Sequence, residues 1–145
     1  MRGIVALGSK TPELKHFPPS VPDIRVRQKC RKLCFLHSES WQDPPDVRVG
    51  NYRVRYADGG SIDVPIYYAR DVYDWWQVEK DVSDPRSTVA WRGGNPASRA
   101  ARKGLIVFKM TWVNPKPDVE VTAVDFESAM RQGSAPFLIA LTVEH

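Results

Sequence analysis

The feature that most constrains the fold is a proline-rich stretch between two alternating apolar runs, at residues 103–128. Apolar residues occupy every second position on both sides: Ile106, Phe108, Met110 and Trp112 before the prolines, and Val119, Val121 and Ala123 after them, with Val124 on the opposite face. A period of two places alternate residues on one face of a β-strand. The two prolines at residues 114–118 cannot continue a central strand, because proline lacks the backbone N–H. The pattern therefore predicts a β-hairpin that turns at residues 114–118.

A second hairpin is predicted at residues 51–68. Apolar and aromatic residues alternate on both sides of Asp58-Gly59-Gly60: Tyr52, Val54 and Tyr56 before it, and Ile62, Val64 and Ile66 after it. Glycine supplies the positive φ that a tight hairpin turn needs. Pro65 indicates an edge position or a bulge, because a proline cannot donate to a neighbouring strand.

Further short strands and one helical turn complete the predicted elements. The strands are expected at residues 3–7, 33–37, 88–91 and 135–143, and the helical turn at residues 97–102. Together with the hairpins this gives about eight short strands separated by turn residues. The pattern predicts an all-β fold, an antiparallel two-sheet sandwich of the jelly-roll type. The chain has 145 residues, the usual size of one domain, so residues 1–145 are expected to form a single domain.

Composition excludes several classes of protein. An apolar content of 42% and a charged content of 26% are typical of a globular chain and not of a disordered one. No apolar run approaches the roughly 20 residues of a membrane-spanning helix. The apolar stretch at residues 4–7 is too short for the core of a signal peptide, so no export signal is expected in the sequence as written.

Positive charge is concentrated near the N-terminus. Residues 1–40 hold eight Lys/Arg and three Asp/Glu, a net charge of +5 within an overall +4. Most of the excess is one segment: Arg25, Arg27, Lys29, Arg31 and Lys32. A basic stripe could bind a polyanion, or it could be a solvated strand edge whose charge prevents edge-to-edge pairing. The second interpretation is favoured, because one short stripe falls well short of a basic domain, and nucleic acid is not an expected partner.

Cysteine and histidine spacing indicates neither a disulfide nor a metal site. Cys30 and Cys34 would lie about 13 Å apart in an extended segment, whereas a disulfide needs Cα atoms within about 7 Å. We therefore expect two free thiols, at least one of them buried. His16, His37 and His145 are scattered and complete no set of zinc ligands, so no metal and no cofactor is expected.

Several short motifs, in order, resemble one known family. They are Phe35-Leu36-His37 with Trp41, residues 56–59, Arg70-Asp71 with Trp75-Trp76, Ala90-Trp91 with Asn95-Pro96, residues 111–115, and residues 136–138. Over residues 24–144 they resemble the galactose-binding-like jelly rolls, similar to carbohydrate-binding modules, at the C-terminal ends of large bacterial envelope and regulatory proteins. Most of these domains are uncharacterised. The resemblance implies a two-sheet sandwich within a larger parent protein and an extracytoplasmic location.

The sequence departs from this family at its N-terminus. Such domains carry one or two further strands ahead of the segment that matches residues 4–7. The sandwich is therefore expected to have an open sheet edge, or the native chain to begin earlier. An open edge is a template for pairing with another chain, so self-association through it is a further expectation.

The five tryptophans are the most suggestive functional feature. Aromatic rings stack on the apolar C–H face of a pyranose, while neighbouring polar groups bind its hydroxyls. Tryptophans and polar residues of this kind fall together in two predicted loops, which makes a candidate carbohydrate site of Trp41, Asp43, Arg70, Asp71, Asp74, Trp75 and Trp76.

The competing interpretation is that these tryptophans only fill the core. Trp91 and Trp112 fall on predicted strands and are expected in the core. Of the adjacent Trp75 and Trp76, at most one is expected to be exposed, because neighbours in an extended chain face opposite ways.

No catalytic motif is present. Asp71 and Asp74 could be imagined as the carboxyl pair of a glycosidase, but nothing in the sequence brings them together. His37 lies among apolar residues, as a hydrogen-bonded core histidine would. The sequence therefore predicts a non-catalytic binding module, most plausibly for carbohydrate. The alternative is a structural or assembly domain that docks a protein partner or a second copy through an open edge.

Overall fold

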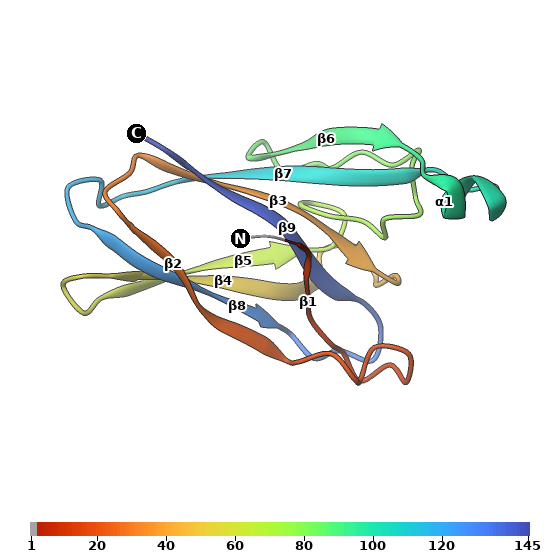
Figure 1. The fold of residues 1–145 in the computed structure, drawn as a ribbon, viewed down its shortest axis with the longest axis horizontal. Helices are drawn as coiled ribbons and strands as arrows, with labels where there is room; N and C mark the ends of the chain where they lie inside the picture. The colour runs from red at the N-terminus through yellow and green to blue at the C-terminus, as the bar shows by residue number, and fades with distance from the viewer. Residues whose placement is uncertain (1–2) are drawn as a thin grey trace.

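The computed structural model describes residues 3–145 as two antiparallel β-sheets packed face to face (Figure 1). One sheet has five strands, in the order β1 (Val5–Ala6), β9 (Ala135–Glu144), β3 (Lys32–Ser40), β7 (Leu105–Val113) and β6 (Ser87–Gly93). The other has four, in the order β2 (Ser20–Gln28), β8 (Val121–Ser128), β4 (Arg48–Tyr56) and β5 (Ser61–Tyr67). One short helix, α1 (Pro96–Ala100), forms where a helical turn was predicted. The predicted all-β, two-sheet antiparallel sandwich is confirmed.

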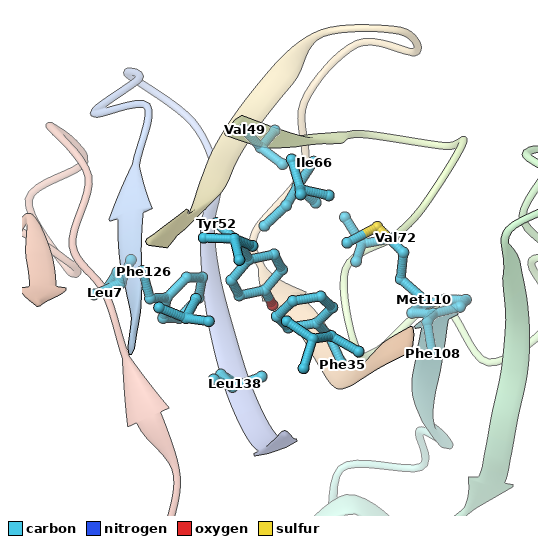
Figure 2. Close-up of a cluster of buried hydrophobic side chains, with 14 of the residues drawn as sticks. Leu7, Phe35, Val49, Tyr52, Ile66, Val72, Phe108, Met110, Phe126 and Leu138 are labelled. Atoms are coloured by element: carbon cyan, nitrogen blue, oxygen red, sulfur yellow. The ribbon is translucent and has the colours of Figure 1, made fainter. Parts of the chain in front are cut away.

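A stack of three aromatic rings joins the two sheets at the centre of the core (Figure 2). The ring of Phe35 on β3 lies 3.9 Å from that of Tyr52 on β4, and Tyr52 lies 4.9 Å from Phe126 on β8. All three side chains are fully buried. Each aromatic pair contributes about 1 kcal/mol beyond the burial of its area, so this stack stabilises the contact between the sheets.

The hairpin predicted at residues 51–68 is confirmed. β4 and β5 pair antiparallel, with Val54 opposite Ile62. Gly59 has φ +88°, the left-handed conformation for which the turn needs glycine. β5 is the edge strand of its sheet, which is where Pro65 costs no ladder hydrogen bond.

The hairpin predicted at residues 103–128 is wrong. Both strands exist, but β7 pairs with β3 and β6, whereas β8 pairs with β2 and β4. The proline-rich connection therefore passes from one sheet to the other. An alternating pattern shows that a strand has one buried face, and two consecutive strands satisfy this equally well when they face each other across the core.

Asn114 anchors this connection between the sheets. Its Oδ1 accepts hydrogen bonds from the Tyr56 hydroxyl at 2.6 Å and from the Lys116 N–H at 2.9 Å. Its Nδ2 donates to the carbonyl of Cys30 at 2.8 Å. One buried side chain thus ties the start of the crossing to the end of β4 and to the segment between β2 and β3.

Bulges change which side chains reach the core. The pairing of β8 with β4 shifts register between Val121 and Ala123, and as a result Val121 and Val124 both join the core. Val124 was expected on the opposite face. β6 shifts register between Val89 and Trp91, and Trp91 is exposed instead of buried, which corrects its predicted core position. Trp112 is half-buried against the core, in line with its prediction.

The predictions about the thiols and the basic segment agree with the structure. Cys30 and Cys34 are both free and buried, as expected. The basic segment begins on β2, the other edge strand of the four-stranded sheet, and its five basic side chains are exposed, as a solvated edge would be. No helix within residues 3–145 is long and apolar enough to cross a membrane.

Candidate functional site

A pocket of about 690 Å³ lies at the end of the five-stranded sheet where β3 ends and β7 and β9 begin. These strands are antiparallel neighbours, so their ends and the loops beside them meet at one place. The pocket is lined by Thr11, Leu14, Ser40, Trp41, Gln42, Asp74, Trp75, Trp76, Lys103, Gln132 and Gly133. Its volume lies within the range of about 300–1,000 Å³ that is typical of small-ligand sites.

Trp41 is held at the pocket in an unusual backbone conformation. It directly follows β3, its φ is +68°, and its side chain is 50% exposed. A bulky residue in the left-handed region costs about 1–3 kcal/mol, and such residues cluster at functional sites. Trp41 thus lies beyond the end of the central strand β3, with its indole beside the pocket instead of in the core.

Trp75 and Trp76 are both half-buried and both line the pocket. The N–H of Trp75 donates to the carbonyl of Glu39 at 2.9 Å, and its carbonyl accepts from Ile106 N–H at 2.9 Å. These bonds fix the segment between the ends of β3 and β7. The two indole rings lie 4.9 Å apart at an angle of 52°, and Trp75 packs edge-to-face on Phe137 at 5.7 Å.

Two charged groups accompany the indoles. Asp74 is nearly buried, and its Oδ1 accepts from the Trp76 N–H at 3.3 Å. Burial raises the pKa of the Asp74 carboxyl, while the Trp76 N–H and the positive charge of Lys103 lower it. The Lys103 ammonium lies 5.4 Å from the centre of the Trp76 ring, within cation–π range. The pocket thus offers a carboxyl group and an ammonium beside three aromatic faces.

Glu39 lies behind the pocket, next to Ser40 on β3, in a backbone bridge with Asp74. Its side chain is fully buried, and neither carboxylate oxygen has a hydrogen-bond partner among residues 3–145. Burial raises the pKa of Glu39 well above 4.5; the carboxylates of Asp43 and Asp74 raise it further, while Ser134 lowers it. The Ser134 proton is engaged with Asp43 Oδ2 at 2.7 Å, so Glu39 is best accommodated as the neutral acid.

Asp43, a predicted ligand-binding residue, shapes the pocket from outside its lining. Its Oδ1 accepts from Arg131 Nε at 3.0 Å, and its Oδ2 accepts from Ser134 N–H at 2.9 Å. These bonds hold the loop that carries Gln132 and Gly133. A Cβ on Gly133 would lie 2.7 Å from the Gln42 carbonyl, so only glycine fits this close approach.

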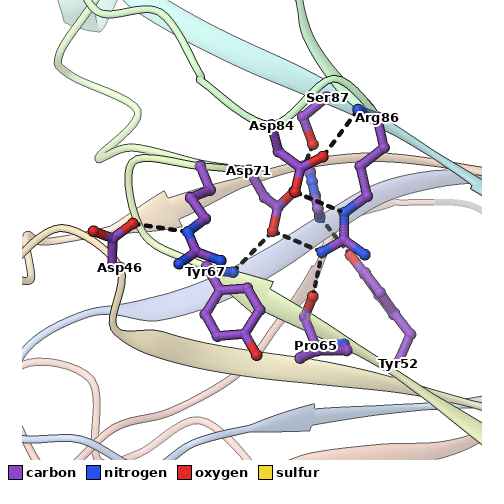
Figure 3. A network of polar contacts seen from close by, with 10 residues as sticks. Asp46, Tyr52, Pro65, Tyr67, Asp71, Asp84, Arg86 and Ser87 are labelled. Atoms are coloured by element: carbon purple, nitrogen blue, oxygen red, sulfur yellow. Dashed lines mark hydrogen bonds and ion pairs between the residues drawn. The ribbon is translucent and has the colours of Figure 1, made fainter.

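Arg70 and Asp71, also predicted for the site, lie outside the pocket lining. Asp71 belongs to a separate polar network (Figure 3). The buried Asp71 carboxylate accepts from both Nε and Nη2 of Arg86, at 3.1 and 2.9 Å, and from the Ser87 hydroxyl at 2.6 Å. Arg70 pairs with the exposed Asp46 at 2.7 Å and lies over the ring of Tyr67. Their contacts are structural ties between loops and strands.

The structure therefore brings four of the seven predicted residues together: Trp41, Asp74, Trp75 and Trp76. Sequence reasoning missed Lys103, Gln42 and Gln132, which belong to no motif or period. Only their proximity to sheet ends could have indicated them. Residues 3–145 contain no group of three or more His, Cys, Asp and Glu side chains placed to hold a metal ion.

Comparison with protein-family models, with curated proteins and with solved structures gives no match for this chain. The structure itself defines the class of protein, an antiparallel two-sheet β-sandwich with an aromatic pocket at one end. This architecture is compatible with a jelly roll.

Proposed function

We propose that this protein is a non-catalytic binding module whose pocket, lined by Trp41, Trp75 and Trp76, takes a carbohydrate. The observation that carries the proposal is the convergence of these three indoles, from two separate segments, on one pocket. Core-filling tryptophans would be expected to face the space between the sheets, but these line the pocket at the end of one sheet.

The chemistry of the lining suits a saccharide. A sugar ring has apolar C–H faces that stack on indoles and a rim of hydroxyls that need donors and acceptors. The pocket supplies both kinds of polar group, from Asp74, Lys103, Gln42 and Gln132. Aromatic faces beside placed polar groups are typical of ligand sites. The resemblance to galactose-binding-like jelly rolls supports the same ligand class.

The placement of the carboxyl groups supports a binding role over a hydrolytic one. Asp71 and Asp74 were the imagined catalytic pair, yet only Asp74 lines the pocket. Asp71 is fully buried and bonded to Arg86 and Ser87, so its oxygens are already engaged. A glycosidase needs two carboxyl groups on either side of one scissile bond.

The test is tryptophan fluorescence of the full chain, titrated with a panel of mono- and polysaccharides. We expect a saturable shift with one sugar class, and its loss in Trp41→Ala, because this substitution removes an exposed stacking face. Trp91→Ala is the matched control, since Trp91 is exposed to the same degree (48% against 50%) but lies on β6, outside the pocket lining.

Thermal unfolding checks that both variants remain folded. If no sugar in the panel gives a saturable response, or if Trp91→Ala removes the response as completely as Trp41→Ala, the carbohydrate assignment is refuted.

A further inference from the structure

Asp74 has a carboxylate oxygen to which no group of the described chain donates. Its Oδ1 accepts from the Trp76 N–H at 3.3 Å, whereas its Oδ2 has no hydrogen-bond partner within residues 3–145. Asp74 is only 6% exposed, and it lines the pocket of Trp41, Trp75 and Trp76, called here the tryptophan pocket. Oδ2 keeps its access to solvent. The tryptophan pocket therefore contains a nearly buried acceptor that a ligand can use.

The backbone of Asp74 is fixed by neighbours on both sides. Its N–H donates to the Tyr68 hydroxyl at 3.1 Å, and its carbonyl accepts from the Gln77 N–H at 2.8 Å. A backbone bridge also joins Asp74 to Glu39, near the end of β3. A ligand that binds the carboxylate therefore does not have to order it first, and this saves affinity.

The charges at the pocket favour a cationic group of a ligand over an anionic one. Lys103 is the one basic residue among the described residues that line the pocket, and it is exposed, so water and salt screen its charge. Asp74 is nearly buried, where attraction to an opposite charge is stronger and less screened. Behind the pocket, Asp43 and Arg131 pair at 3.0 Å, and Glu39 is fully buried as the neutral acid. The strongest attraction that a charged ligand meets is therefore that of Asp74.

The three indoles also favour positive charge. The face of an aromatic ring carries the negative part of its quadrupole, so it attracts a cation and not an anion. The molecule itself shows this at Trp76: the Lys103 ammonium lies 5.4 Å from the centre of the ring and forms no ion pair with a residue in the range 3–145. A protonated amine beside Asp74 would therefore meet aromatic faces as well as a carboxylate.

We propose that the saccharide of the tryptophan pocket is an amino sugar, whose ring stacks on an indole and whose ammonium pairs with Asp74. This inference rests on the proposed function, because it names the class of saccharide that the same pocket takes. Lys103 brings a like charge to the lining, so it opposes the ligand that Asp74 attracts. The two residues should therefore act on the affinity for an amino sugar in opposite directions.

The test is tryptophan fluorescence of the full chain, titrated with sugars that differ in one substituent, at a slightly acidic pH where their amines are protonated. D-Glucosamine and D-galactosamine are compared with D-glucose and D-galactose, with the two N-acetyl derivatives, and with D-glucuronic and D-galacturonic acid. We expect at least one amino sugar to bind about tenfold more tightly than its neutral parent and its N-acetyl derivative. The uronic acids should bind no more tightly than the neutral sugars.

Two pairs of variants assign the preference to the pocket. Asp74→Asn keeps the shape of the side chain and removes its charge, so it should reduce the preference for the amino sugar to within about twofold. Asp81→Asn changes the net charge equally at an exposed position outside the lining and should leave the preference unchanged. Lys103→Gln should strengthen binding of the amino sugar about twofold or more, whereas Lys109→Gln, exposed and outside the lining, should not. Thermal unfolding checks Asp74→Asn, and the two lysine variants are expected to fold because both side chains are exposed.

Three results would overturn the inference. Neutral sugars that bind within about twofold of the amino sugars would refute it and leave the carbohydrate assignment standing. A preference that persists in folded Asp74→Asn, or that Lys103→Gln weakens, would mean that the ammonium does not pair with Asp74. If none of the sugars gives a saturable response, the carbohydrate assignment is refuted, and this inference with it.

Discussion

Burial favours the neutral forms of two ionisable side chains on β3, His37 and Glu39, so the two groups change the stability of the fold in opposite directions as the pH rises. Burial lowers the pKa of His37 from 6.5 to about 4, so the folded protein keeps the imidazole neutral where the unfolded chain binds a proton. This contribution to stability is present above pH 6.5 and is lost as the pH falls toward 4. Burial raises the pKa of Glu39 well above 4.5, so the folded protein keeps a proton that the unfolded chain releases. Stability is therefore lost through Glu39 as the pH rises above 4.5.

Replacement of Glu39 with glutamine should flatten the alkaline side of this profile. Glutamine is a neutral side chain of the same shape, so it removes the cost of keeping the acid protonated. We expect the free energy of unfolding to fall less between about pH 5 and pH 9 in Glu39→Gln than in the parent protein. Urea denaturation at several pH values measures this. Glu79→Gln, at an exposed position, is the control, and equal slopes in all three proteins would contradict the prediction.

The Tyr52 hydroxyl is the one hydrogen-bond partner that the His37 imidazole ring has within residues 3–145. The distance from Tyr52 Oη to His37 Nδ1 is 2.7 Å, whereas Nε2 has no partner. Tyr52→Phe should lower the free energy of unfolding by about 1–3 kcal/mol, because it leaves a buried ring nitrogen unpaired. Tyr67→Phe, at a half-buried position, should change stability by less than about 1 kcal/mol. Equal losses in the two variants, measured by urea denaturation, would argue against this role.

At the scale of elements, Asp71 ties strands of the two sheets together. It accepts hydrogen bonds from the backbone of Tyr67 on β5 and from the hydroxyl of Ser87 on β6. Its ion pair with Arg86 extends the tie, because Arg86 Nη2 also donates to the Pro65 carbonyl at 2.6 Å. The edge strands β5 and β6 are thereby joined without a ladder between them (Figure 3).

Asp71→Asn should destabilise the protein through this tie. The substitution removes the two closest charged contacts of the partly buried Arg86 guanidinium and leaves only Asp84, at 3.8 Å, as a counter-charge. We expect a loss of about 2–4 kcal/mol. Asp46→Asn is the matched control: it breaks the exposed pair with Arg70 and should cost less than about 1 kcal/mol. Thermal or urea unfolding compares the two. A loss as small for Asp71→Asn as for Asp46→Asn would show that the tie contributes nothing.

Local patterns predicted what depends on neighbours in sequence. The β4–β5 hairpin followed from a glycine turn between two alternating runs, because a short turn leaves the strands only one way to pair. The connection between β7 and β8 has no such constraint, since alternation reports a buried face and not the identity of the neighbouring strand. The exposure of Trp91 depends on a β-bulge between Val89 and Trp91, and the residue pattern did not predict this bulge.

The candidate site, too, could be predicted only in part from the sequence. Trp41, Asp74, Trp75 and Trp76 were found because tryptophans in loops are conspicuous. Their convergence depends on the antiparallel pairing of β3 with β7 and β9, which brings distant chain ends together. Lys103 and Gln132 line the pocket only because that pairing brings the starts of β7 and β9 to the end of β3. Conversely, Asp71 is close to the predicted site residues in the sequence, but its side chain lies outside the pocket lining, hydrogen-bonded to Arg86 and Ser87.

At the scale of the whole molecule, the tryptophan pocket lies at the end of the five-stranded sheet, where the ends of β3, β7 and β9 meet. Aromatic stacking does not depend on salt, whereas attraction between exposed charges is screened within about 8–10 Å at physiological ionic strength. The affinity of the pocket for a neutral saccharide should therefore not depend on ionic strength.

Titrations at 50 and 500 mM sodium chloride test this expectation on one protein sample. The affinity for the saccharide identified by fluorescence should change by less than about twofold, because stacking on Trp41, Trp75 and Trp76 needs no exposed ion pair. A ligand held by attraction between exposed charges would instead lose affinity by about tenfold or more over the same range. A saccharide affinity that falls to that extent would mean that attraction between exposed charges, and not stacking, holds the ligand in the pocket.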